Sequence, residues 1–285
     1  MPAVPEPPSV ETITAVDRRT PLPATLVQAI GQEYRRISRP PFEALLTVSI
    51  NAAMMSSAWF FLPSDVVDKV FELHGSLAFA FVLSSWMYSD VPATNILGAD
   101  AAQILEAMDQ PLTLRRILAA RRVVLWSVVA PICLLISCII GFGTADPIVA
   151  VYSVVAIGVI PYGVLAVSGW VGILYPYHPV PILFRLQHRR QWWPMLGRWA
   201  TLVLLPYGLV PALSFAFMAP TLLIWGLTSK TGLTKKLPDN NVGFGIALAC
   251  ALALVAVVVG QRVSLRLIVH RRTKLVAYLS DPRLG

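Results

Sequence analysis

The sequence predicts an all-α integral membrane domain with six transmembrane helices, an N-terminal interfacial helix and a short helix in a cytoplasmic connection. Three observations predict this class. Apolar residues make up 56% of the chain and charged residues only 13%, about half the charged share of an ordinary soluble domain. The apolar residues gather in runs of about 20, the length that crosses the hydrocarbon of a bilayer as a helix. Helices are expected because lipid offers no hydrogen-bond partner to an open backbone group.

Six apolar runs are candidate spans: 42–62, 66–88, 123–142, 147–175, 199–219 and 243–267. Prolines within the fourth and fifth runs predict kinks. Pro220 interrupts the apolar sequence after the fifth run, and the seven residues 221–227 that follow are too short to span. We interpret them as a re-entrant or interfacial helix, with one long fifth helix as the alternative.

The distribution of basic residues predicts the orientation. Of the Lys and Arg residues, 19 lie in the two terminal segments and in the connections after spans two and four, against 4 on the other side. The positive-inside rule then places both termini in the cytoplasm of a cell whose plasma membrane holds the chain. Because these charges flank apolar runs and form no stripe, the net charge of +8 does not indicate nucleic-acid binding.

This orientation divides the chain into four parts. Residues 1–23 are rich in proline and are expected to form a disordered tail. Residues 24–41 form the interfacial helix, 42–267 the six-span domain, and 268–285 a basic cytoplasmic tail. Cys133, Cys138 and Cys250 all lie in apolar runs, and we expect them to act as small apolar filler rather than as a disulfide framework or a metal site.

The interfacial helix is predicted from its periodicity and its first turn. Thr25 and Gln28 fit a capping box, and an apolar stripe follows at helical spacing. The stripe comprises Leu26, Ile30, Tyr34 and Ile37. A plain membrane-proximal anchor is the alternative to a helix with a specific role.

Basic and aromatic residues in two segments are predicted to contact lipid headgroups. One segment is the interfacial helix, and the other precedes the fifth span, where indole rings suit the headgroup zone. The predicted contact residues are Arg35, Arg36, Arg189, Arg190, Trp192 and Trp193.

The connection between spans two and three is long and is predicted to be structured. Asp100 and Gln103 form a plausible N-cap pair for a helix over residues 101–109, which Pro111 ends. A second helix is expected to begin near Thr113 and to continue into the third span. Such a short amphipathic helix suits docking into a groove of a soluble partner, or it packs only on its own protein. Its apolar patch comprises Ile104, Leu105 and Met108.

The segment 103–122 contains Ile104-Leu105-Glu106, Pro111-Leu112-Thr113, Ile117-Leu118 and Arg121-Arg122. It resembles the cytoplasmic loop between spans two and three in permease subunits of the type-2 class of ABC exporters. That family has six spans, both ends inside, an interfacial helix before the first span and an outer helical segment between spans five and six. The resemblance covers most of residues 24–285 by topology and about twenty residues by motif.

The resemblance implies that the helix 101–109 is a coupling helix that contacts an ATP-binding-cassette ATPase subunit. It also implies a second permease copy, or a related permease, and a hydrophobic or amphipathic cargo such as a drug, lipid or glycolipid. The chain has no G-x-x-x-x-G-K-[ST] loop, so ATP and Mg²⁺ are expected on the partner subunit, with no cofactor and no catalytic residue in this chain. The implied coupling residues are Ile104, Leu105, Glu106, Met108, Pro111, Arg115 and Arg116.

Ionisable residues at the outer end of the second span are candidates for the mouth of a transport pathway, because charges at membrane depth are costly. A turn that projects into water is the alternative. The residues are Asp68, Lys69, Glu72 and His74.

Two other function classes fit the same helices. An integral membrane transferase acting on lipids would need paired carboxylates at the interface to hold Mg²⁺. The inner side offers four carboxylates without a D-x-x-D or D-x-x-x-D spacing, namely Asp90, Asp100, Glu106 and Asp109. A non-catalytic accessory subunit of a membrane complex is the other alternative.

Overall fold

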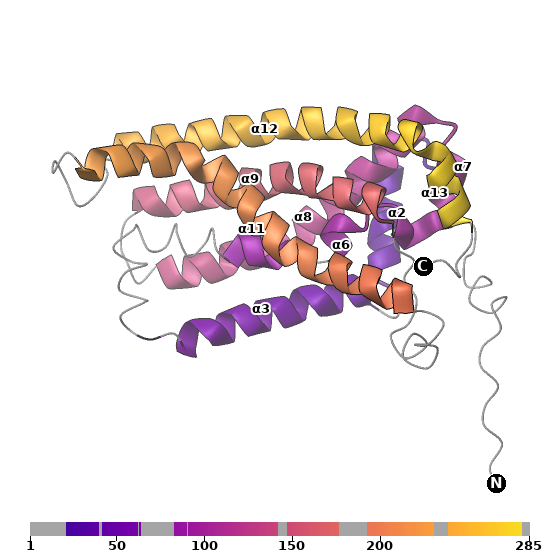
Figure 1. Ribbon diagram of the computed structural model, residues 1–285. Helices are drawn as coiled ribbons and strands as arrows, with labels where there is room; N and C mark the ends of the chain where they lie inside the picture. Colours follow the sequence, from indigo (N-terminus) through magenta and orange to yellow (C-terminus); the bar gives the residue numbers. More distant parts are fainter. Residues whose placement is uncertain are drawn as a thin grey trace, which may run out of the picture.

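The computed structural model describes residues 21–39, 42–61, 63, 83–89, 91–141, 147–176, 193–230 and 239–280. Within these ranges every regular element is a helix. Figure 1 shows the long helices lying side by side, with the short helices α2, α7 and α13 gathered at one end of them. The all-α prediction is therefore confirmed for the part of the chain that the structure describes.

Four helices are long and apolar enough to cross a membrane, as expected for a multi-pass membrane protein. They are α8 (Pro111–Gly141), α9 (Pro147–Leu174), α11 (Trp193–Lys230) and α12 (Asp239–His270), and they contain the third to sixth predicted spans. The first predicted span corresponds to α3 (Glu43–Phe61), whose apolar part, Ala44–Met54, is shorter than a full span. Most of the second, 66–88, lies outside the described residues.

The predicted break at Pro220 is wrong. Helix α11 is continuous through three prolines, Pro206, Pro211 and Pro220, so the alternative of one long fifth helix is correct. Figure 1 shows α11 changing direction along its length and then following the first part of α12. Around Thr221 the two helices nearly touch, since a Cβ atom added to Gly245 would lie 2.8 Å from Thr221 Oγ1. This packing continues past Pro220 and holds the chain helical.

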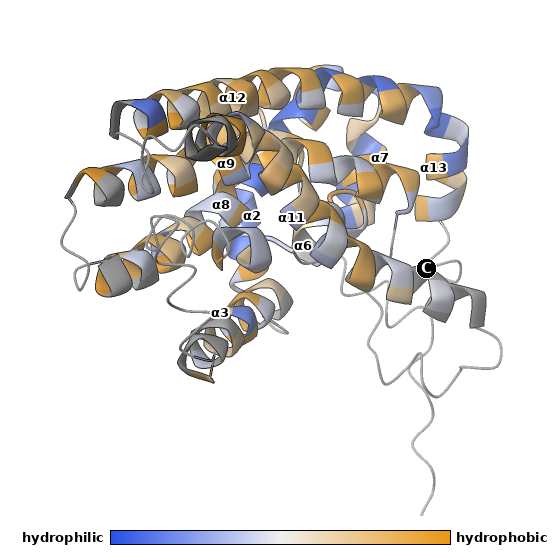
Figure 2. Ribbon diagram, turned by 60° about the vertical axis from the view of Figure 1, so that its left-hand side comes forward, coloured by the Kyte–Doolittle hydropathy of each residue, from blue (hydrophilic) through white to orange (hydrophobic). Residues whose placement is uncertain are grey.

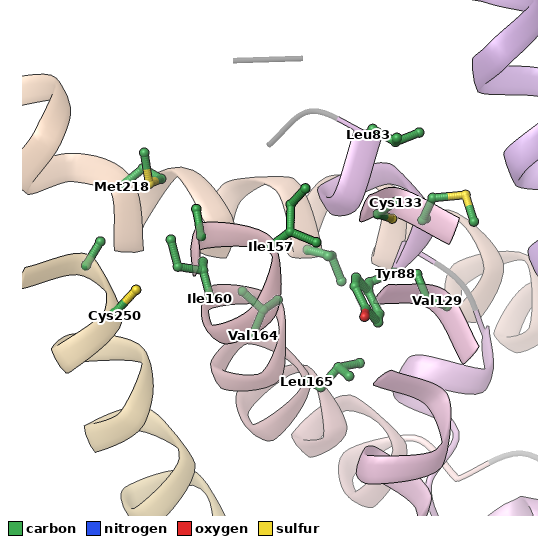
Figure 3. Packing of buried hydrophobic residues seen from close by; sticks show 14 of the residues in the cluster. Leu83, Tyr88, Val129, Cys133, Ile157, Ile160, Val164, Leu165, Met218 and Cys250 are labelled. Carbon is green, nitrogen blue, oxygen red and sulfur yellow. The ribbon is translucent and has the colours of Figure 1, made fainter. Parts of the chain in front are cut away.

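The main hydrophobic core lies around α9. Figure 3 shows α9 between Cys250 of α12 on one side and Tyr88 and Val129 on the other. Cys133 and Cys250 are buried in this core, in agreement with apolar packing, whereas Cys138 is only partly buried.

Small residues allow α9 and α12 to approach closely. A Cβ atom added to Gly163 would lie 2.7 Å from the Cα atom of Ala253, and one added to Gly260 would lie 2.8 Å from the carbonyl oxygen of Ala166. Close backbone approach at small residues is a common way to pack helices in membranes, where burial of apolar surface drives association only weakly. The indole of Trp170 adds a hydrogen bond to the Gly260 carbonyl at 3.2 Å.

Five short helices complete the described structure: α2 (Leu26–Ile37), α6 (Val91–Thr94), the 3₁₀ helix η1 (Gly98–Asp100), α7 (Ala101–Ala107) and α13 (Arg272–Leu279). Helix α13 corrects the prediction that 268–285 is a tail. Three of its side chains, Leu275, Tyr278 and Leu279, are buried in a second hydrophobic cluster with α7 and the first turns of α8. Burial of this i, i+3, i+4 set orders the segment.

Candidate functional site

The candidate site is the layer formed by α2, α7, α13 and the first three turns of α8, which we call the end layer. It lies at one end of the long helices (Figure 1). Helix α2 begins as predicted, because Thr25 Oγ1 accepts a hydrogen bond from the Gln28 backbone N–H at 3.2 Å. The Gln28 side chain in turn accepts from the Ala24 N–H at 2.9 Å, which satisfies a second open donor.

The face that α2 packs against α8 differs from the predicted stripe. Its buried residues are Ala29, Glu33 and Ile37, spaced four apart. Of the predicted stripe, Ile37 is buried in this face and the Tyr34 hydroxyl hydrogen-bonds to Ser127 of α8, whereas Leu26 remains 43% exposed. Glu33 belongs to the buried face because its carboxylate has a charged partner on α8, Arg121.

Glu33 is held by two arginines. Its carboxylate accepts hydrogen bonds from Arg36 Nε, at 2.9 Å, and from Arg36 Nη2, and Arg121 Nε lies 3.8 Å from Glu33 Oε2. Burial raises the pKa of the Glu33 carboxyl, but the hydrogen bond from Arg36 and the charges of Arg36 and Arg121 outweigh it, so the net pKa is lowered. Glu33 therefore stays ionised and fixes α2 on α8.

Arg121 connects α8 to a third segment. Its Nη1 donates to the backbone carbonyl of Ile96, in the turn before η1, and only 6% of its side-chain surface is exposed. Within the described residues its Nη2 has no hydrogen-bond partner. The buried Arg121 guanidinium makes one ion pair and one hydrogen bond to a carbonyl. Removing Glu33 would leave its charge buried without an ion-pair partner and would destabilise the packing of α2 on α8.

Helix α7 is formed and capped as predicted. Asp100 Oδ1 accepts from the Gln103 backbone N–H at 3.0 Å. The Gln103 side chain donates to Gln32 Oε1 of α2 at 3.2 Å, and Gln32 donates to the Pro21 carbonyl at 2.9 Å. A chain of three polar groups thus joins α7, α2 and the segment before α2.

The apolar patch of α7 packs on its own protein. Ile104 is fully buried and Met108 is 8% exposed, in the cluster that also contains Leu275 and Leu279 of α13. Ile104 and Met108 are thus covered by α13, as in the alternative that the helix packs on its own protein, and a partner at this surface would contact other residues. Leu105 is partly buried in the same cluster.

One exposed surface of the end layer is the corner between α7 and α8. Of the predicted coupling residues, Glu106, Pro111 and Arg115 are exposed and Arg116 is partly exposed. Leu112, which was not predicted, is 66% exposed at this corner. Its position follows from Pro111 occupying the first position of α8, where the absence of an N–H costs nothing.

Two arginines after α12 support the end layer in different ways. Arg271 Nη1 donates to the carbonyls of Leu174, at 2.7 Å, and Ile173, at 3.3 Å, which closes the C-terminal end of α9. Arg272 forms an ion pair with Asp109 at the end of α7, with both side chains more than half exposed. Sequence reasoning missed both contacts, since each joins residues far apart in the chain.

The remaining predicted site residues are placed as follows. Arg35 is exposed. Arg36 donates hydrogen bonds to Glu33, so lipid phosphate would have to share its guanidinium with that carboxylate. Trp193 is the first residue of α11. The other predicted residues of the pathway mouth and lipid contacts lie outside the described residues: Asp68, Lys69, Glu72, His74, Arg189, Arg190 and Trp192.

The carboxylates considered for a lipid transferase have separate surroundings. Asp100 caps α7, Asp109 pairs with Arg272, and Glu106 is exposed. Asp90 lies outside the described residues. Within the ranges that the structure describes, no group of three or more His, Cys, Asp or Glu side chains is arranged to hold a metal ion.

Comparisons with protein-family models, with curated proteins and with solved structures gave no match.

Proposed function

We propose that the chain is the permease subunit of an ATP-driven exporter of the type-2 ABC class, which moves a hydrophobic or amphipathic cargo outward. In this proposal the chain crosses the plasma membrane six times with both termini in the cytoplasm. Two permeases, either two copies or this chain with a related one, form the pathway. ATP and Mg²⁺ are held by a separate ATP-binding-cassette subunit.

The observation that carries the proposal is the construction of the end layer. A short helix, α7, is capped by Asp100, held by α2 through the Gln32–Gln103 hydrogen bond, and buttressed by α13. The next helix, α8, leaves this layer and continues without a break into a candidate span. A rigid helix joined directly to a membrane helix suits the transfer of movement from a soluble partner to the pathway.

The exposed corner is a chemically mixed surface of the kind that a partner groove recognises. It combines the acidic Glu106, the apolar Leu112 and the basic Arg115, all exposed within ten residues of one another. An exposed leucine at a polar corner costs solubility, and covering it by a partner removes that cost. In this proposal the partner contacts the corner. Ile104 and Met108 hold α7 in position by packing against α13.

The test is recovery of an ATPase partner. Tagged full-length chain is expressed in its own host and purified, and ATP-binding-cassette subunits are identified and quantified by mass spectrometry. We expect Glu106→Arg with Leu112→Asp to lower their recovery at least tenfold. Lys274→Glu with Val276→Asp, an exposed pair on α13, is the matched control and should retain recovery.

Two outcomes would overturn the proposal. One is that the wild-type chain recovers no ATP-binding-cassette subunit, and the other is that the corner variant recovers as much as the control. Turnover of a lipid substrate by the purified chain alone, with Mg²⁺ present, would instead support the transferase.

A further inference from the structure

The exposed face of α12 changes from apolar to basic along one line. Seven exposed residues recur at intervals of three or four, which places them on one side of the helix. The first four are apolar and the last three can donate hydrogen bonds. In order they are Leu248, Leu252, Val255, Val259, Arg262, Arg266 and His270. Figure 2 shows the same change, with hydrophobic colours along α12 and hydrophilic ones toward α13.

The basic part of this line has no anionic partner on the helices around it. The four helices that pack most closely on α12, namely α8, α9, α11 and α13, contain no Asp or Glu. The one carboxylate of α12 itself, Asp239, is at its opposite end. Asp109, which lies against the start of α13, already pairs with Arg272. Arg262 and Arg266 are exposed and form no ion pair with any described residue, so their charges are available to an external anion.

A shallow hollow lies beside the last of these residues. It is open to the outside and is lined by four residues of α12 itself: Leu265, Arg266, Val269 and His270. Its surface is almost entirely apolar, and Val269 is 69% exposed. An apolar hollow edged by a guanidinium matches the upper part of a lipid, where an acyl chain meets its charged headgroup.

We propose that this face of α12 binds an anionic phospholipid of the surrounding bilayer. The lipid phosphate lies against Arg262 and Arg266, with His270 as a further donor, because guanidinium groups form paired, charge-assisted hydrogen bonds with phosphate oxygens. The acyl chains lie along Leu248–Val259, and the outer part of the headgroup lies over the hollow beside Arg266 and His270. The inference does not depend on the transport proposal, since it concerns a different surface.

A second copy of the chain fits this face less well. In a dimer with a two-fold axis along the membrane normal, two α12 helices that met through this face would run parallel. Arg262 and Arg266 of one copy would then face the same residues of the other, and like charges at close range repel. A lipid phosphate neutralises the same charges.

The experiment measures lipid binding to the full-length chain in detergent by native mass spectrometry, with the unfolding temperature as a second readout. Phosphatidylglycerol and phosphatidylcholine with identical acyl chains are compared. Arg262→Gln with Arg266→Gln is compared with Arg39→Gln with Lys274→Gln, an exposed pair that removes the same charge. We expect phosphatidylglycerol to bind the wild type and the control more tightly than phosphatidylcholine does, and to raise their unfolding temperature. The α12 variant should bind it roughly thirtyfold more weakly.

Three outcomes would overturn the inference. The first is equal binding of the two lipids by the wild-type chain, and the second is equal loss of phosphatidylglycerol binding in both double variants. The third is a change from dimer to monomer in the α12 variant with no change in lipid binding, which would make this face a contact between copies. Glycerol phosphate without acyl chains is added separately, and stabilisation equal to that by the lipid would show that a soluble anion is the ligand.

Discussion

Arg121 Nε lies 3.8 Å from Glu33 Oε2, and this contact joins the helix before the first apolar segment to the start of a membrane-crossing helix. Both side chains are nearly buried, at 6% and 10% exposure. Arg36 completes the group and is itself 37% exposed. The packing of α2 therefore depends on the buried Glu33–Arg121 pair, whereas water screens the Glu33–Arg36 pair.

Glu33→Gln should lower the free energy of unfolding by about 3 kcal/mol, because it leaves the buried charge of Arg121 without a counter-ion. Arg36→Gln should cost less than about 1 kcal/mol, since Arg36 is partly exposed. The measurement is thermal or denaturant unfolding in detergent. Glu33→Gln with Arg121→Gln should be less destabilised than the sum of its single variants by at least about 1 kcal/mol. Strict additivity would contradict a direct interaction.

The same carboxylate makes stability depend on acid. The pKa of Glu33 is lowered in the folded chain from its ordinary value of 4.5, so the folded state binds this proton less readily than the unfolded state does. The stabilisation is complete above pH 4.5 and is lost as the pH falls through the lower folded value. We expect the difference in unfolding temperature between the wild type and Glu33→Gln to be constant near neutral pH and to shrink in acid. A difference that grows in acid would show the opposite sign.

The features of the end layer that could be predicted are those that depend on residues close together in the sequence. The caps Thr25–Gln28 and Asp100–Gln103 each depend on residues three positions apart, and both formed. The start of α7 is set by Asp100 as predicted, but the helix ends at Ala107, two residues before the predicted end at 109. Local hydrogen bonds of this kind need no knowledge of the fold.

The parts that could not be predicted depend on contacts between distant segments. Glu33 lies outside the apolar stripe that periodicity predicts for α2, and its partner Arg121 on α8 explains its burial. The exposure of the α7 patch was misjudged because α13 covers it. The spacing of Leu275, Tyr278 and Leu279 could have indicated α13, but the surrounding basic residues suggested a tail. Similarly, the continuity of α11 past Pro220 depends on α12.

Replacing Arg271 and replacing its neighbour Arg272 should change the free energy of unfolding by different amounts. Arg271→Ala should lower the free energy of unfolding by about 1.5–3 kcal/mol, because a charged donor to two carbonyls at the end of α9 is lost. Arg272→Ala should cost less than about 1 kcal/mol, since both members of its pair with Asp109 are more than half exposed. Raising the salt concentration should reduce the Arg272 effect and leave most of the Arg271 effect. Equal effects of the two substitutions in unfolding experiments would contradict this assignment.

The close approach of α9 and α12 can be tested by adding one methyl group at two glycines of the same helix. A Cβ atom at Gly163 would meet the Cα and carbonyl oxygen of Ala253 at 2.7 Å, whereas one at Gly158 meets nothing within 4 Å. Gly163→Ala must push backbone apart and should cost about 1–3 kcal/mol of unfolding free energy.

Gly158→Ala is the matched control for this test. It should be neutral or should stabilise by roughly 0.5–1 kcal/mol, because alanine loses less backbone freedom in a helix than glycine does. Unfolding temperatures of the two variants in one detergent give the comparison directly. If Gly163→Ala unfolds at the same temperature as Gly158→Ala, then α9 and α12 are held together by larger side chains and not by contact between their backbones.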